Sequence, residues 1–161
     1  MNSLIRVGMA DFKVCMAPNV LTTLGLGSCV GIVLYDAGVK VGGMVHIMLP
    51  DSTKFAKNEN KAKYADTGIQ TLIEEMVKQG ATKGRMTAKI AGGAQMFAFS
   101  SNNEMLRIGE RNVEAVKSIL KELRINIIAE DTGKNYGRTI EFNTDTGVLK
   151  IKSVGKPDKC I

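Results

Sequence analysis

The sequence of 161 residues contains no tryptophan, only 5% aromatic residues and a single histidine. With so few rings to stack on bases, and with no recognisable nucleic-acid module, the net charge of +6 does not indicate nucleic-acid binding. The 22 basic and 16 acidic residues are spread along the chain. This distribution is typical of a solvated basic surface, and the sharper alternative is attraction to an acidic protein surface.

Long apolar runs are also lacking, so no stretch is suited to crossing a bilayer. Residues 1–7 lack the basic region, long apolar region and cleavage site of a secretory signal, and they read as the start of a strand. The three cysteines, Cys15, Cys29 and Cys160, are an odd number, so a disulfide framework is neither complete nor needed. We therefore expect a single cytoplasmic domain over residues 1–161, without membrane insertion.

Short β-branched runs alternate with two amphipathic segments, which predicts an α/β (α+β) domain rather than a bundle or a sandwich. Helices are expected over residues 60–79, stopped by Gly80, and over residues 110–123. Turn residues at 36–38 and 144–147 predict two hairpins. The buried stripe of the first helix should comprise Ala65, Ile69, Leu72, Ile73, Met76 and Val77. The expected strands are residues 5–9, 12–15, 30–35, 41–48, 87–91, 125–130, 139–143 and 148–153.

His46 lies in an apolar strand pattern where nothing requires an imidazole. It is either a buried histidine held by a backbone carbonyl or a catalytic base. Cys29 favours the second interpretation, because it ends a run in which Gly25, Gly27 and Ser28 permit backbone angles closed to most residues. N–H groups of Gly27 and Ser28 can then converge beside the sulfur as an oxyanion hole. The plainer alternative for Cys29 is a small buried hydrophobe at a strand start.

A hairpin between Cys29 and His46 would return both side chains to the same end of a sheet. A neighbouring imidazole raises the thiolate fraction of a cysteine, so the pair predicts a thiol-dependent amide hydrolase. Thr22 and Thr23 are candidates for orienting the second imidazole nitrogen, against the plain alternative of ordinary strand residues.

Two rival sites are weak. A zinc site would need Cys15, Cys29, Cys160 and His46 from four distant segments, without the short cysteine spacing of a zinc knuckle. The glycine pairs at residues 25–27 and 92–93 lack the lysine and hydroxyl residue of a phosphate-binding loop. We expect no metal and no cofactor.

Five segments together resemble the CheD family of chemoreceptor glutamine deamidases, and the likeness covers nearly the whole chain. They are Gly25–Val30, Gly43–Pro50, Lys63–Asp66, and Lys89–Phe97 followed by Ile108–Asn112. One departure is Lys134, which replaces the second glycine of a pair that the family tends to have after an aspartate.

The resemblance implies a cysteine hydrolase fold similar to deamidating bacterial toxins, with layered mixed sheets and outer helices. It implies Cys29 as nucleophile, His46 as base and Thr23 as the group orienting the histidine. The implied substrate is the cytoplasmic helical bundle of chemoreceptors, and the implied partner is the phosphatase CheC. A non-catalytic module that binds receptors and CheC is the alternative function.

Overall fold

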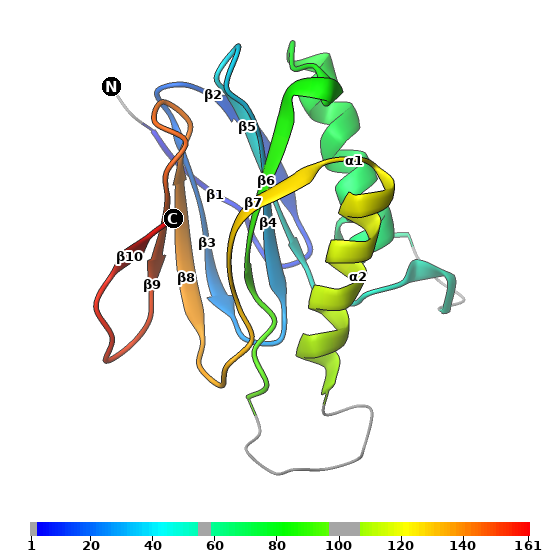
Figure 1. The fold of residues 1–161 in the computed structure, drawn as a ribbon, viewed down its shortest axis with the longest axis vertical. Helices are drawn as coiled ribbons and strands as arrows, with labels where there is room; N and C mark the ends of the chain where they lie inside the picture. The colour runs from blue at the N-terminus through cyan, green and yellow to red at the C-terminus, as the bar shows by residue number, and fades with distance from the viewer. Residues whose placement is uncertain (1–2, 55–58, 97–106) are drawn as a thin grey trace.

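In the computed structural model, which describes residues 3–54, 59–96 and 107–161, two sheets lie face to face and two helices cover the outer side of one (Figure 1). Sheet A comprises, in spatial order, β1 (Leu4–Arg6), β3 (Val20–Leu26), β8 (Arg138–Asn143), β9 (Leu149–Lys152) and β10 (Lys159–Cys160). Sheet B comprises β2 (Phe12–Met16), β5 (Val41–Ile47), β4 (Val30–Asp36), β6 (Met86–Gly92) and β7 (Asn126–Thr132). The helices are α1 (Ala65–Lys78) and α2 (Ile108–Glu122). Among the described residues, short 3-10 turns cover Ser52–Lys54, Lys61–Lys63 and Lys83–Arg85.

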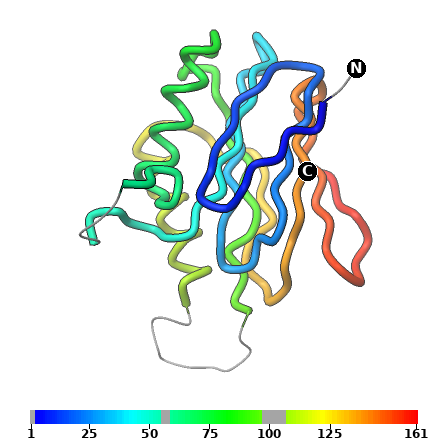
Figure 2. Tube along the Cα trace, turned by 180° about the vertical axis from the view of Figure 1, so that it is seen from behind, coloured from blue at the N-terminus to red at the C-terminus, as the bar shows by residue number. Residues whose placement is uncertain are grey.

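Both sheets are mixed. In sheet B, β4 pairs antiparallel with β5 and β6, whereas β6 and β7 run parallel because α2 connects them as a crossover. In sheet A, β1 runs parallel to β3, and β8 pairs antiparallel with β3 and β9. Figure 2 shows the N-terminal segment passing from β1 to β2 along one side of the two sheets. The two predicted hairpins, β4–β5 and β8–β9, are confirmed.

The core has two layers, one on each side of sheet B. Val45 and Ile47 of β5 face the helices, where they meet the apolar stripe of α1. Met44, on the opposite face of the same strand, lies between the two sheets with Leu26 and Ile140. A strand that is buried on both faces reads as a continuous apolar run, which is why β4 and β5 could be predicted from sequence.

The predicted α/β class and most predicted strands agree with the structure. Strand β3 was not among the expected strands, although Thr22 and Thr23 were considered as strand residues, because Gly25 and Gly27 interrupt the strand pattern. Gly25 has a φ of 69°, and the β3–β8 register shifts between Thr23 and Leu26. Glycine at such a bulge interrupts the strand pattern without ending the strand. Strand β10 was also missed, since two residues carry no periodicity.

The structure differs from the sequence predictions at two element boundaries and at one stripe residue. Helix α1 begins at Ala65 rather than at residue 60, since Tyr64 is extended at φ −114° and ψ 144°. Val77 is 48% exposed, so its place in the buried stripe was wrong. Strand β1 ends at Arg6, and a turn follows in which Gly8 N–H donates to the Asp11 carboxylate over 3.2 Å. Within the described residues, no helix combines the length and apolar character that a bilayer crossing requires.

Candidate active site

The predicted site residues gather at one end of the two sheets. The β3–β4 turn, which carries Cys29, lies there together with the last residues of β5, β6 and β7 and the first turn of α2 (Figure 1). Segments that are far apart in sequence therefore meet at the end of the sheets that carries Cys29.

His46 points into the space between the two sheets. It follows Met44 by two positions on β5, so both side chains share one face. Across the ladder His46 pairs with Gly31 of β4. A Cβ at Gly31 would lie 2.7 Å from Ile140 Cδ1, so this glycine lets sheet A come close at the level of His46. Ile140 is the ladder partner of Thr23, and the close approach brings Thr23 to the imidazole.

Thr23 Oγ1 lies 2.7 Å from His46 Nδ1, and both side chains are fully buried. The same hydroxyl donates its only hydrogen to the backbone oxygen of Val7, also over 2.7 Å. Thr23 must therefore accept from His46, which puts the imidazole proton on Nδ1 and leaves the Nε2 lone pair free. This tautomer is the one that a general base acting through Nε2 requires.

Thr22, the other threonine considered from the sequence, faces elsewhere. Its hydroxyl donates to the Ile140 carbonyl over 2.8 Å, within sheet A. Because successive residues of a strand point to opposite faces, only one of the two threonines can reach His46.

The N-terminal segment also holds His46. Ala10 N–H donates to His46 O over 2.9 Å, and His46 N–H donates to Asp11 O over 3.1 Å. Val7 in the same segment supplies the carbonyl that fixes Thr23. Residues 7–11 thus fix the position of the His46 main chain and, through Thr23, the tautomer of its imidazole.

The main chain around Cys29 is held from several sides. Cys29 O accepts from Gly93 N–H over 2.8 Å, and Gly27 O accepts from Ala94 N–H over 2.8 Å. Gly27 N–H donates to Gly25 O over 3.1 Å, so it is not available to a substrate oxygen. In the described part of the chain, the N–H groups of Ser28 and Cys29 donate to no backbone carbonyl. The Cys29 N–H interacts with its own sulfur. Two successive amides without a carbonyl partner form the kind of turn that binds an anion.

Burial affects the protonation states of Cys29 and His46. Cys29 is 9% exposed, and its burial raises the pKa of the thiol, an effect that its own N–H partly offsets. Burial likewise lowers the pKa of His46, because the charged imidazolium loses its solvent. Both directions favour a resting pair of neutral thiol and neutral imidazole rather than an ion pair.

His46 Nε2 is buried and, among the described residues, has no hydrogen-bond partner. No hydrogen bond joins it to Cys29 in the resting protein. Catalytic hydrogen bonds commonly tighten only when substrate binds, so the lack of this bond in the resting protein is compatible with proton transfer during the reaction.

Several residues that support the site were missed as functional from the sequence. Asn112 of α2 donates from Nδ2 to Ser28 O over 2.9 Å and to Met48 O over 3.0 Å. Arg138 of β8 donates to Gly133 O over 3.0 Å and pairs with Asp131 over 3.1 Å. An asparagine on a helix and an arginine at a strand start carry no local signal of these contacts. Phe97, the last residue of the Lys89–Phe97 motif, lies outside the described residues.

Lys134, the departure from the family pattern, keeps the conformation that glycine favours. Its φ is 63°, in the left-handed region. Its carbonyl accepts from Gln95 N–H over 2.8 Å, which ties this loop to the segment after β6. Lysine therefore adopts this conformation at the cost of backbone strain.

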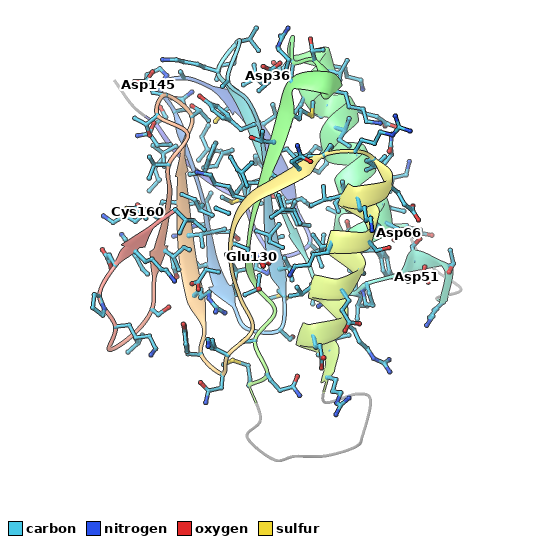
Figure 3. All side chains as sticks on the ribbon, in the orientation of Figure 1. Asp36, Asp51, Asp66, Glu130, Asp145 and Cys160 are labelled. Atoms are coloured by element: carbon cyan, nitrogen blue, oxygen red, sulfur yellow. The ribbon has the colours of Figure 1, made fainter. Side chains whose placement is uncertain are left out.

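The four soft ligands considered for zinc do not come together. Cys160 lies on the edge strand β10, at the far side of sheet A from β3 (Figure 3). Nowhere in residues 3–54, 59–96 and 107–161 do three His, Cys, Asp or Glu side chains cluster in a way that could hold a metal ion.

Comparison with known proteins identifies close relatives. Residues 48–153 match the family model described as CheD chemotactic sensory transduction. Over 161 residues the chain is 67% identical to the probable chemoreceptor glutamine deamidase CheD of Lachnoclostridium phytofermentans, with 100% of each chain covered. Over 160 residues it is 56% identical to the chemoreceptor glutamine deamidase CheD of Halalkalibacterium halodurans, with 99% of each covered. The family match begins after His46, whereas these two alignments also span Thr23 and Cys29.

A solved structure shares the fold at low identity. The crystal structure of a Neisseria meningitidis protein of family-model DUF152 superposes with a TM-score of 0.52 at 11% sequence identity. The match covers 82% of this chain and 64% of that one. At this identity the likeness concerns the fold alone.

Proposed function

The chain belongs to the CheD family, and from this membership we propose that it is a chemoreceptor glutamine deamidase with Cys29 as nucleophile, His46 as base and Thr23 as the residue that orients the base. The substrate is a glutamine side chain on the cytoplasmic helical bundle of a chemoreceptor. The product is glutamate, and ammonia leaves.

One observation carries the assignment of roles. Thr23 donates to Val7 O and therefore accepts from His46 Nδ1, which leaves Nε2 unprotonated on the only histidine of the chain. A histidine that served only in packing would not require a hydroxyl acceptor at Nδ1 such as Thr23, whose own proton is already donated to Val7 O. This arrangement supports a base that acts through Nε2.

In the first step, His46 Nε2 takes the proton of the Cys29 thiol while Sγ attacks the side-chain carbonyl carbon of the glutamine. Because the pKa of Cys29 is raised and that of His46 is lowered, proton transfer and attack occur together rather than from a preformed thiolate. The amides of Ser28 and Cys29 donate to the developing oxyanion. Of the two oxyanion residues expected from the sequence, Ser28 is retained and Gly27 is replaced by Cys29, since the Gly27 N–H is bound to Gly25 O.

In the second step, the imidazolium returns its proton to the nitrogen of the departing amide, and ammonia leaves a thioester on Cys29. A water molecule then attacks the thioester, again with His46 Nε2 as base. Collapse of this intermediate releases glutamate and restores the thiol. Every step uses side chains and main-chain groups of this chain, with no cofactor.

Incubation of the protein with a chemoreceptor cytoplasmic fragment tests the proposal. Peptide mass analysis should show amide-to-acid conversion at selected glutamines, with a matching release of ammonia. Free glutamine should be a very poor substrate, because the receptor surface supplies most of the binding energy. Binding of the fragment without any mass change would instead support the alternative, a non-catalytic binding module.

We also propose that the phosphatase CheC binds the same end of the molecule. Apolar side chains are exposed there, with Leu24 at 44% and Met96 at 48%, and Met96 approaches Gly27 beside the thiol. A partner that covers these side chains competes with the receptor. Addition of purified CheC should therefore slow deamidation of the receptor fragment in proportion to its binding.

A further inference from the structure

Helix α2 contributes a buried amide to the surroundings of Cys29. Asn112 has no exposed surface, although asparagine is usually found at the protein surface. Its Nδ2 donates to two carbonyl oxygens, Ser28 O at 2.9 Å and Met48 O at 3.0 Å. Since both partners are acceptors, only the NH2 end of the amide fits this position.

A glycine one turn earlier brings the helix within reach. Gly109 and Asn112 are three positions apart, so they share one face of α2. A Cβ at Gly109 would lie 2.7 Å from Gly93 O, and only glycine permits this approach. The first turn of α2 is therefore pressed against the segment after β6 that also holds Cys29.

The two carbonyls that Asn112 joins belong to the two halves of the proposed reaction centre. Met48 follows His46 by two positions, directly after the end of β5, and Ser28 precedes Cys29. A trans peptide is planar, with its C=O and N–H directed to opposite sides. Holding Ser28 O on Asn112 therefore fixes the direction of the Cys29 N–H, which donates to no backbone carbonyl in the described residues.

We propose that Asn112 is a positioning residue that holds the Ser28–Cys29 peptide so that the Cys29 N–H binds the oxyanion. The inference rests on the proposed deamidase function. Asn112 acts through the main chain, and among the described residues its side chain makes no hydrogen bond to His46 or to the Cys29 sulfur.

A purely structural role explains the amide poorly. Asn112 Oδ1 is buried and has no partner in the part of the chain that the structure describes. A buried amide oxygen without a hydrogen bond is unfavourable, whereas an apolar side chain of similar size would avoid the cost. The amide is thus better explained by what its NH2 group holds than by packing.

The test compares two reactions of the same thiol. Deamidation develops an oxyanion, whereas alkylation by iodoacetamide does not: Sγ bonds to the reagent carbon, iodide leaves, and the thiol proton passes to His46 and then to solvent. The variant is Asn112→Leu, which keeps the approximate size and removes both donors. Asn112→Ala, which leaves room for a water molecule, provides the same comparison if the leucine variant does not fold.

A matched control is Asn143→Ala. Asn143 also holds main-chain groups, through Oδ1 to Asp145 N at 2.9 Å and Thr146 N at 3.2 Å. This turn lies at the opposite end of the sheets from the β3–β4 turn, as the label of Asp145 shows (Figure 3). Its loss should lower the melting temperature without changing either reaction.

We expect kcat for a receptor fragment to fall roughly 10- to 100-fold in Asn112→Leu, since misplacement of a reacting group by about 1 Å can cost roughly 10²-fold. KM and the rate and pH profile of Cys29 alkylation should stay within about threefold of the wild type. An unchanged kcat beside an active wild type would overturn the proposal and leave the deamidase function standing. Parallel losses of deamidation and alkylation would equally overturn it, because Asn112 would then act on the thiol or on the fold.

Discussion

Replacing Thr23 by valine tests the core of the mechanism, because valine has the same shape and lacks only the hydroxyl. In the wild type this hydroxyl lies 2.7 Å from His46 Nδ1 and 2.7 Å from Val7 O, in a fully buried position. In Thr23→Val both groups lose their partner. The imidazole can then move its proton to Nε2, and the histidine is no longer a base toward Cys29.

The magnitude follows from the hydrogen bonds that are lost. A buried polar group left unpaired costs about 1–3 kcal/mol, so Thr23→Val should lower the free energy of unfolding by roughly that amount for Val7 O alone. If the bond to Nδ1 favours the active tautomer by about 1.4–2.8 kcal/mol, its loss reduces kcat by roughly 10- to 100-fold. KM should remain unchanged, since Thr23 is buried and does not contact the substrate. Thr23→Ser, which keeps the hydroxyl, should retain kcat within about threefold.

The neighbouring threonine gives the control. Thr22 is also buried, and its hydroxyl donates over 2.8 Å to Ile140 O without touching His46. Thr22→Val should lose a similar amount of stability and keep the wild-type kcat. The assay is the rate of amide-to-acid conversion in a receptor fragment, measured beside thermal unfolding of each variant. A Thr23→Val protein with wild-type kcat, or a Thr22→Val protein as impaired as Thr23→Val, would refute the reasoning.

Three further predictions concern the nucleophile, the base and the strained loop. Cys29→Ala and His46→Ala should each abolish receptor deamidation, since nucleophile and base act as one unit. Both variants should still bind the receptor fragment in a pull-down. Turnover by either variant would contradict the role assigned to the replaced residue. Burial keeps the pKa of His46 below the ordinary value of a histidine and the pKa of Cys29 above the ordinary value of a cysteine. We therefore expect kcat/KM to fall only as the pH drops below about 6.5 and to stay level through neutral pH. An acid limb with its midpoint above about pH 6.5 would contradict a neutral resting pair. Lys134→Gly should relieve the strain of a φ of 63° and raise the free energy of unfolding by about 0.5–1 kcal/mol in a denaturant titration, and a loss of stability would show that the lysine side chain makes a compensating contact.

Local periodicity explains what could be predicted of the fold. The apolar runs of β4 and β5 and the stripes of α1 and α2 follow from burial on one or both faces, which sequence records directly. Strand β3 was not predicted because Gly25 within it lies at a bulge and Gly27 just after it lies in a turn. The same bulge region carries Thr23, so the least predictable strand is also one that builds the site.

The sequence by itself determined which residues can carry the chemistry. There is one histidine, and only one cysteine follows a glycine-rich segment, so His46 and Cys29 could be selected by their chemical type and local surroundings. Tertiary structure decided what the sequence left open. The residues alone left Thr22 and Thr23 open, and only the family resemblance pointed to Thr23. The contacts of Thr23 with His46 and Val7, and of Asn112 with Ser28, join segments that are distant along the chain. The physical reason is that strand alternation and glycine content are local properties of the sequence. The approach of sheet A to Gly31 of sheet B, and of Gly109 of α2 to the segment after β6, depends on how the layers pack.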